Sequence, residues 1–316
     1  MAIIRNNGQN PNNSHPTASS HRLLRTCLTP ITLPDLLARE FKPREFIIEP
    51  LIHERGLVMI FAWRGVGKTW FALGLAHAIA SGGSFLKWTA KDAKRVVHVC
   101  GEMPATDLQE RLKALTAASN TPLPALFRIL SADLHEFGIP DLASKEGQEA
   151  MEAGIGDAEV VIFDNVSTLF RSGQENDSES WAPVQNWLLK LRREGRTIII
   201  IHHSNKSKAQ RGTSKREDVL DLVLNLREPS GDEADGGARF EVHFEKARGL
   251  TGDVVRPFEA HLKIEDGVAR WSIREIEDAR GDEIAELKAA GKSVRDIALE
   301  TGIPRSTVQR ALARKS

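Results

Sequence analysis

The sequence predicts an α/β protein with a mainly parallel central sheet, followed by a small all-α segment at the C-terminal end. From Leu57 onward, short apolar runs alternate with longer stretches of helical spacing, a pattern typical of parallel strands with crossover helices. From about residue 280 the apolar residues recur only at helical spacing. The buried central strands are predicted at Leu57–Phe61, Val96–Cys100, Val160–Phe163 and Thr197–Ile201.

Length and composition allow one main domain and one small satellite. The chain has 316 residues, 41% of them hydrophobic, and equal numbers of acidic and basic residues, so net charge does not indicate a nucleic-acid partner. Cys27 and Cys100 match no disulfide or metal spacing, which favours free thiols in a reducing compartment. Because no segment is apolar enough to be a membrane span or signal peptide, we expect a cytoplasmic protein with no membrane partner.

Three segments are predicted along the chain. Residues 1–29 form a disordered leader rich in Asn, Ser and Pro, residues 30–278 the main domain, and residues 279–316 the helical satellite. Within the main domain, Val219–Leu226, a turn at Pro229–Asp232 and Phe240–Phe244 are predicted as antiparallel additions at one sheet edge.

The first apolar strand runs directly into a phosphate-binding loop. Its glycines let backbone N–H groups turn toward phosphate oxygens, and the helix that follows adds the positive end of its dipole. Lys68 is expected to reach the β- and γ-phosphates of ATP, and Thr69 to bind Mg²⁺. Ala62 replaces the usual first glycine, which is tolerable only at negative φ. The predicted nucleotide-binding residues are Ala62, Trp63, Arg64, Gly65, Val66, Gly67, Lys68, Thr69 and Trp70.

Three later strands end in polar residues at the same predicted edge of the sheet. Asp164 is the candidate second Mg²⁺ ligand, or alternatively a turn cap. Glu102 is the candidate general base that activates water, or alternatively a first-turn glutamate favoured by the helix dipole. His203 is a candidate γ-phosphate sensor, with a structural histidine as an equal alternative.

Together with these motifs, the segment from about residue 30 to about residue 275 resembles plasmid RepA-type hexameric replicative helicases. These belong to the RecA-like P-loop NTPases, a group that also includes DnaB-like helicases. The matching features are Gly65–Thr69, Ser81-Gly82-Gly83, Trp88, Gly101–Met103, Ile162–Asn165, His202-His203, Arg211–Ser214 and Lys246–Arg248. The resemblance implies ATP hydrolysis with Mg²⁺, translocation on single-stranded DNA, and a homo-oligomer in which a hexameric ring is expected.

The resemblance also gives roles to two basic segments. Lys246 and Arg248 match a pair that reaches the neighbouring subunit's ATP site, with Arg248 as an arginine finger; the alternative is a solvated pair at a sheet edge. The loop Ser204–Glu217 is expected to face single-stranded DNA in the ring channel, although an ordinary solvated loop is equally compatible with it. Its predicted DNA-binding residues are Lys206, Lys208, Arg211, Lys215 and Arg216.

The C-terminal segment has the spacing of a helix-turn-helix and resembles the DNA-binding domains of resolvase and Hin-type recombinases. Helices are predicted at Glu283–Ala290, Val294–Glu300 and Pro304–Ala313, with Gly302 at the turn. A helical hairpin used only for subunit contacts is the alternative. The residues predicted to contact duplex DNA are Arg305, Ser306, Thr307, Gln309 and Arg310.

Two functional interpretations therefore stand, with a third beside them. The first is an ATP-driven DNA motor of the replicative helicase type, and the second is an ATP-regulated DNA-binding protein, a regulator or loader, that does not unwind DNA. A RecA-like recombination or repair mediator that forms filaments is the third. The fold alone does not choose among them.

Overall fold

The computed structural model describes residues 29–119, 123–172, 178–204, 218–229 and 237–315. The chain divides into two compact units, Met1–Pro43 and Arg44–Ser316. In the first unit a short helix, α1 (Leu33–Leu37), begins after Thr32, whose side chain accepts a hydrogen bond from the Asp35 backbone. The predicted leader lies outside the described residues apart from its last residue. Among the ranges given above, no helix is both long and apolar enough to cross a bilayer.

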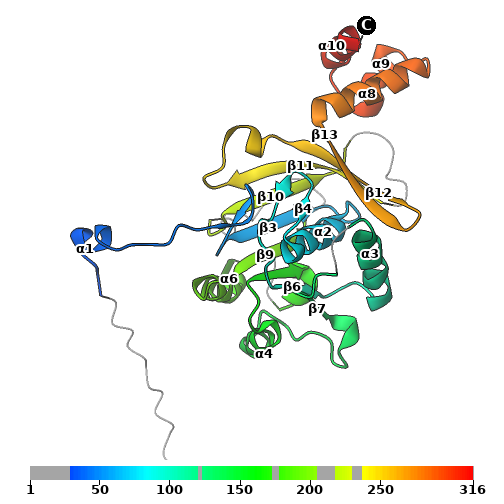
Figure 1. Ribbon diagram of the computed structural model, residues 1–316. Helices are drawn as coiled ribbons and strands as arrows, with labels where there is room; N and C mark the ends of the chain where they lie inside the picture. Colours follow the sequence, from blue (N-terminus) through cyan, green and yellow to red (C-terminus); the bar gives the residue numbers. More distant parts are fainter. Residues whose placement is uncertain (1–28, 120–122, 173–177, 205–217, 230–236, 316) are drawn as a thin grey trace, which may run out of the picture. The chain divides into compact units, whose positions relative to one another are not determined.

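A nine-stranded sheet forms the centre of the second unit, in the order β13-β12-β11-β10-β3-β9-β8-β6-β7 (Figure 1). The six strands from β10 to β7 are parallel, which confirms the predicted α/β class with a mainly parallel sheet. These strands are β3 (Leu57–Ala62), β6 (Val96–Cys100), β7 (Phe127–Ser131), β8 (Val160–Asp164), β9 (Thr197–His203) and β10 (Leu222–Arg227).

The four apolar runs form central strands because both of their faces are covered. Every residue of β3, β6 and β8 is buried, and in β9 only the last residue, His203, is partly exposed. A strand buried on both faces needs apolar residues at every position, which explains why the runs are continuous and do not alternate with polar residues.

The antiparallel part of the sheet differs from the prediction in one strand. β11 (Ala238–Ala247), β12 (Phe258–Glu265) and β13 (Val268–Glu275) are antiparallel, as expected for an addition at the edge. The strand expected at Val219–Leu226 begins at Leu222 and pairs antiparallel with β11 as predicted, but on its other side it lies parallel to β3. The predicted Pro229–Asp232 turn lies mostly outside the described residues.

Helices cover both faces of the sheet and create two cores. On one face, α2 (Lys68–Ser81) lies in a large cluster with residues of β3, β6 and β11. On the other face, α4 (Lys145–Ile155), α5 (Val166–Leu169) and α6 (Ser178–Arg193) bury their apolar sides. α3 (Ala105–Ala117) packs on the first face. This arrangement is the one expected for a largely parallel sheet.

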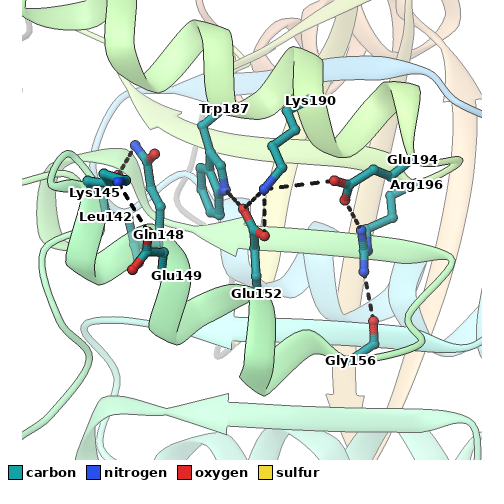
Figure 2. Close-up of polar contacts among 10 residues, drawn as sticks. All are labelled: Leu142, Lys145, Gln148, Glu149, Glu152, Gly156, Trp187, Lys190, Glu194 and Arg196. Carbon is teal, nitrogen blue, oxygen red and sulfur yellow. Dashed lines mark hydrogen bonds and ion pairs between the residues drawn. The ribbon is translucent and has the colours of Figure 1, made fainter. Parts of the chain in front are cut away.

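A polar network joins α4 to α6 above the second core (Figure 2). The Glu152 carboxylate accepts hydrogen bonds from the Trp187 indole N–H at 2.8 Å and the Lys190 ammonium at 2.7 Å. The first of these hydrogen bonds fixes the polar end of the buried Trp187 side chain, and the second ties Lys190 to the same carboxylate. At the end of α6, Arg196 pairs with Glu194 and donates to the Gly156 carbonyl at 2.8 Å.

The remaining described elements are short. Two small hairpins are formed by β1 (Phe46–Ile48) with β2 (Ile52–His53), and by β4 (Ser84–Phe85) with β5 (Trp88–Thr89). Two 3-10 turns occur, η1 at Ala132–Leu134 and η2 at Gly252–Val255.

The last three helices enclose a small core of their own. They are α8 (Ile276–Ala289), α9 (Val294–Thr301) and α10 (Arg305–Lys315). The buried apolar residues of this core are Ile284, Ile297, Ile303 and Val308. Gly302 adopts φ 67° at the turn before α10, where glycine is favoured. The first of these helices is longer than predicted, because it begins directly after β13 and not at Glu283. The predicted boundary at residue 278 therefore falls inside α8.

Candidate nucleotide site

The carboxyl ends of four neighbouring parallel strands meet beside one cavity. In the order β3-β9-β8-β6, each strand delivers its following residues to the same edge of the sheet. The cavity has a volume of about 440 Å³. Its lining residues are Arg64, Gly65, Gly67, Lys68, Thr69, Trp70, Cys100, Glu102, Met103, Pro104, Asp107, Arg111, Asp164, Asn165, His203 and Gly237.

The loop between β3 and α2 has the backbone that a phosphate cradle needs. Gly65 and Gly67 adopt positive φ, 84° and 112°, and Gly67 is the N-cap residue of α2. A Cβ on Gly67 would also lie 2.6 Å from the Cβ of Ala238, so both conformation and space require glycine there. Ala62 is not among the non-glycine residues with positive φ, and it ends a regular strand. Its methyl group is therefore accommodated without backbone strain.

Lys68 is held at the base of this loop. Its ammonium donates to the carbonyls of Ala62 at 3.0 Å and Trp63 at 2.8 Å, and only 6% of the residue is exposed. Burial lowers the pKa of Lys68 to about 8, an effect that the nearby Asp164 and Glu102 carboxylates oppose. Ala62 and Trp63 thus contribute through their carbonyls and do not line the cavity, while the predicted Val66 side chain is buried in the first core.

Asp164 lies at the end of β8 with 5% of its surface exposed. Burial raises the pKa of its carboxyl to about 6, although the Thr69 hydroxyl and the Lys68 ammonium act in the opposite direction. Its Oδ2 atom is buried without a hydrogen-bond partner and lies 3.7 Å from Nε2 of His98. Asp164 is also among the residues that line the cavity.

Glu102 and His203 come together across the cavity. The Asn165 side-chain amide donates a short hydrogen bond to Glu102 Oε2, and His203 Nε2 lies 3.7 Å from the same oxygen. The Glu102 side chain is 62% exposed, so water reaches it freely. Burial and the nearby Lys68 lower the pKa of His203, which favours the neutral ring.

Several lining residues were not predicted from the sequence. Arg111 of α3 lies with its guanidinium carbon 5.0 Å from the centre of the Trp70 ring, and burial lowers its pKa. Asp107 precedes it by one helical turn and lines the same cavity. A charged pair at i, i+4 directly after the Glu102 loop was an available signal for this side of the cavity. No sequence signal indicates Gly237.

Lys246 and Arg248 do not line this cavity. Both donate to the carbonyl of Asp218, Lys246 at 3.3 Å and Arg248 at 2.6 Å. Ala247 pairs with Leu222, which pairs with Val58 near the start of β3. The two basic residues therefore lie at the amino ends of the parallel strands, at the opposite edge of the sheet from the phosphate loop.

The predicted DNA-binding residues fall into two groups. Lys206, Lys208, Arg211, Lys215 and Arg216 lie outside the described residues. In α10, Arg305, Ser306, Gln309 and Arg310 are exposed and Thr307 is half-buried. Arg310 donates to the Ser306 carbonyl and the Thr307 hydroxyl, each at 3.3 Å.

The donor set fits a magnesium nucleotide. Hard cations prefer oxygen ligands, and Asp164 and Thr69 supply a carboxylate and a hydroxyl beside a loop in which Gly65 and Gly67 adopt positive φ. Asp164 Oδ2 is buried without a hydrogen-bond partner, close to the buried Lys68 ammonium. Burying such charged groups costs free energy unless a ligand interacts with them. Both charges are complementary to a phosphate-bound cation and to the phosphates themselves.

Comparisons with known proteins agree with this geometry. The flagellar accessory protein FlaH from Methanocaldococcus jannaschii has a similar structure, with a TM-score of 0.50 over 70% of this chain and 91% of that chain, at 13% sequence identity. That likeness supports the predicted RecA-like fold and nothing finer. A search of curated proteins found no match. The family model described as AAA domain matches residues 24–209, which span β3, the phosphate loop, Glu102, Asp164 and His203, and the chain belongs to that family of ATPases.

Proposed function

We propose that this protein is an ATP-hydrolysing DNA motor, of the RepA/DnaB-like replicative helicase type, that translocates on single-stranded DNA. The observation that carries the ATPase part is the meeting of the phosphate loop, Lys68, Asp164 and Glu102 around one cavity. The proposed action on DNA rests on the resemblance of the basic segments to those of RepA-type helicases, and on the exposed polar residues of α10.

Each residue at the cavity has a distinct role in the proposed hydrolysis. Lys68 binds the β- and γ-phosphates, and Thr69 and Asp164 hold Mg²⁺, which neutralises charge on the phosphate oxygens. Glu102 orients and deprotonates the attacking water, and its exposure and its hydrogen bond from Asn165 suit that role. His203 lies 3.7 Å from Glu102, where a neutral ring can register the state of the γ-phosphate.

Arg248 acts in the site of a neighbouring subunit. In its own subunit it lies at the edge of the sheet opposite the phosphate loop, so it can contact a γ-phosphate only in a second copy of the chain. A guanidinium there stabilises charge on the phosphoryl oxygens during transfer, and Lys246 adds a second positive charge. Hydrolysis then depends on assembly. A head-to-tail contact of this kind gives a ring where the rotation closes, and the resemblance to RepA-type helicases favours a hexameric one.

DNA contacts are assigned to two basic segments. The Ser204–Glu217 segment follows β9 directly and carries the predicted single-strand contacts. The helices α8 to α10 form a helix-turn-helix whose α10 presents Arg305, Gln309 and Arg310 to duplex DNA. An exposed basic helix on a small separate core suits recruitment to a duplex.

That same module supports a second candidate, an ATP-regulated DNA-binding protein that does not unwind DNA. Under this alternative, ATP controls assembly or partner loading, and single strands have no effect on hydrolysis. A filament-forming recombination or repair mediator is the remaining alternative, and its activity would respond to single strands without forming a closed ring.

The deciding experiment measures steady-state ATPase rate against protein concentration, without DNA, with single-stranded DNA and with duplex DNA. Wild type is compared with Arg248→Ala and with Arg270→Ala, a matched control on the edge strand β13. Glu102→Gln is included, and it should bind ATP without hydrolysing it.

If the protein is a motor, single-stranded DNA should stimulate the ATPase rate cooperatively. Arg248→Ala should abolish this stimulation, and Arg270→Ala should retain it. Closed rings or open filaments in electron micrographs of the ATP-bound protein separate the motor from the mediator. ATPase rates that change neither with single-stranded DNA nor with the Arg248→Ala substitution favour the regulatory protein. Unchanged hydrolysis in Glu102→Gln would refute the assignment of Glu102 as the general base.

A further inference from the structure

His98 is a fully buried histidine whose ring has no hydrogen-bond partner. It lies in β6, is 0% exposed, and neither Nδ1 nor Nε2 is hydrogen-bonded. A neutral imidazole carries one N–H donor and one acceptor, and leaving such a buried donor unpaired costs about 1–3 kcal/mol. In an otherwise apolar strand, Val or Ile would avoid this cost, so the position calls for another explanation.

The missing partner lies on the neighbouring strand. Asp164 Oδ2 is also buried without a hydrogen bond, and it is 3.7 Å from His98 Nε2. One group lacks an acceptor and the other lacks a donor. A relative movement of less than about 1 Å would bring the pair into ordinary hydrogen-bond range.

We propose that His98 is a positioning residue for the Asp164 carboxylate, donating its Nε2–H to Oδ2 so that the other oxygen faces Mg²⁺. This inference rests on the proposed magnesium-nucleotide site. Outer-shell donors of this kind orient a ligating carboxylate, and their loss typically lowers metal affinity about 10- to 100-fold.

The chemistry of a histidine suits this position better than the alternatives. A neutral imidazole has one N–H donor, so the ring can donate a hydrogen bond without adding positive charge beside the cation site. A lysine or arginine would neutralise the carboxylate and repel the metal. An apolar side chain would leave Oδ2 without a partner.

The test compares three variants of β6 in the full-length protein. His98→Leu removes the donor, His98→Gln keeps an N–H at similar reach, and Val97→Ala creates a cavity on the opposite face of the same strand. Should His98→Leu not fold, His98→Met fills the same space with a flexible apolar chain. Binding of a fluorescent ADP analogue is measured in EDTA and across a Mg²⁺ titration.

The expected result is a Mg²⁺ midpoint raised about 10- to 100-fold in His98→Leu, with its affinity in EDTA unchanged. His98→Gln and Val97→Ala should keep the wild-type midpoint. An unchanged midpoint in His98→Leu, an equal loss of affinity in EDTA, or the same shift in His98→Gln would each overturn the inference. If wild type itself binds the nucleotide without any response to Mg²⁺, the proposed function fails, and this outcome is distinct because it appears before any substitution.

Discussion

Replacing Asp164 by Asn should stabilise the nucleotide-free protein relative to wild type, and this difference should grow as the pH rises. The reason is that the buried wild-type carboxylate ionises at higher pH, which costs free energy in the folded state. The residue is 5% exposed, and burial raises its pKa from 3.8 to about 6. In the unfolded chain the carboxyl group releases its proton at lower pH than in the folded protein. The folded state therefore loses stability as the pH rises through this interval.

The size of the effect follows from the two pKa values. Linkage gives an ionisation cost of about 2 kcal/mol at about pH 5 and about 3 kcal/mol at about pH 8. Between these conditions, wild type should lose about 1 kcal/mol of unfolding free energy relative to Asp164→Asn. Loss of Asp164 also removes an attraction for the Lys68 ammonium, so the change with pH is a better test than the absolute difference.

Urea unfolding in EDTA without nucleotide, followed by tryptophan fluorescence at a series of pH values, measures this change. Asp157→Asn is the matched control, since Asp157 is exposed and pairs with Arg128, which lowers its pKa and gives the opposite trend. A stability difference between Asp164→Asn and wild type that stays flat or falls with rising pH would refute the reasoning. Adding Mg²⁺ and nucleotide should stabilise wild type more than the variant.

Three further substitutions test other parts of the structure. Gly67→Ala would place a Cβ 2.6 Å from that of Ala238 at φ 112°, and should reduce nucleotide binding and melting temperature; wild-type values would contradict this. Ile297→Ala, at a fully buried position, should cost the last three helices about 2–5 kcal/mol and weaken duplex binding in filter assays, while DNA-free ATPase rates stay unchanged. Glu152→Ala leaves the buried Trp187 N–H without its acceptor and should cost about 1–3 kcal/mol in urea unfolding, an expectation that an unchanged midpoint would disprove.

The central strands and the phosphate loop could be predicted because their signals are local. A strand covered on both faces requires consecutive apolar residues, as in β6 and β8. Positive φ at Gly67 and the following helix are likewise encoded within a few residues. These features fix where the chain can bind a phosphate, without knowledge of any distant contact.

The contacts within the site depend on strand order, which local patterns do not encode. His98 and Asp164 lie far apart in the sequence and meet only because β6 and β8 are neighbours. Arg111 reaches Trp70 only because α3 packs on the same face as α2. The antiparallel pairing of β10 with β11 was predicted, but its parallel pairing with β3 was not, since the pattern of a single strand does not reveal which partner lies on its other side.

The sequence alone therefore determined the fold class, the phosphate loop and the acidic residues at the strand ends, because each follows from backbone and burial requirements of neighbouring residues. Only the tertiary structure decided which of those groups are buried, which pKa values shift, and which edge of the sheet holds Arg248. The physical reason is that desolvation and electrostatic interaction depend on distances through space, and these are set by packing between distant segments.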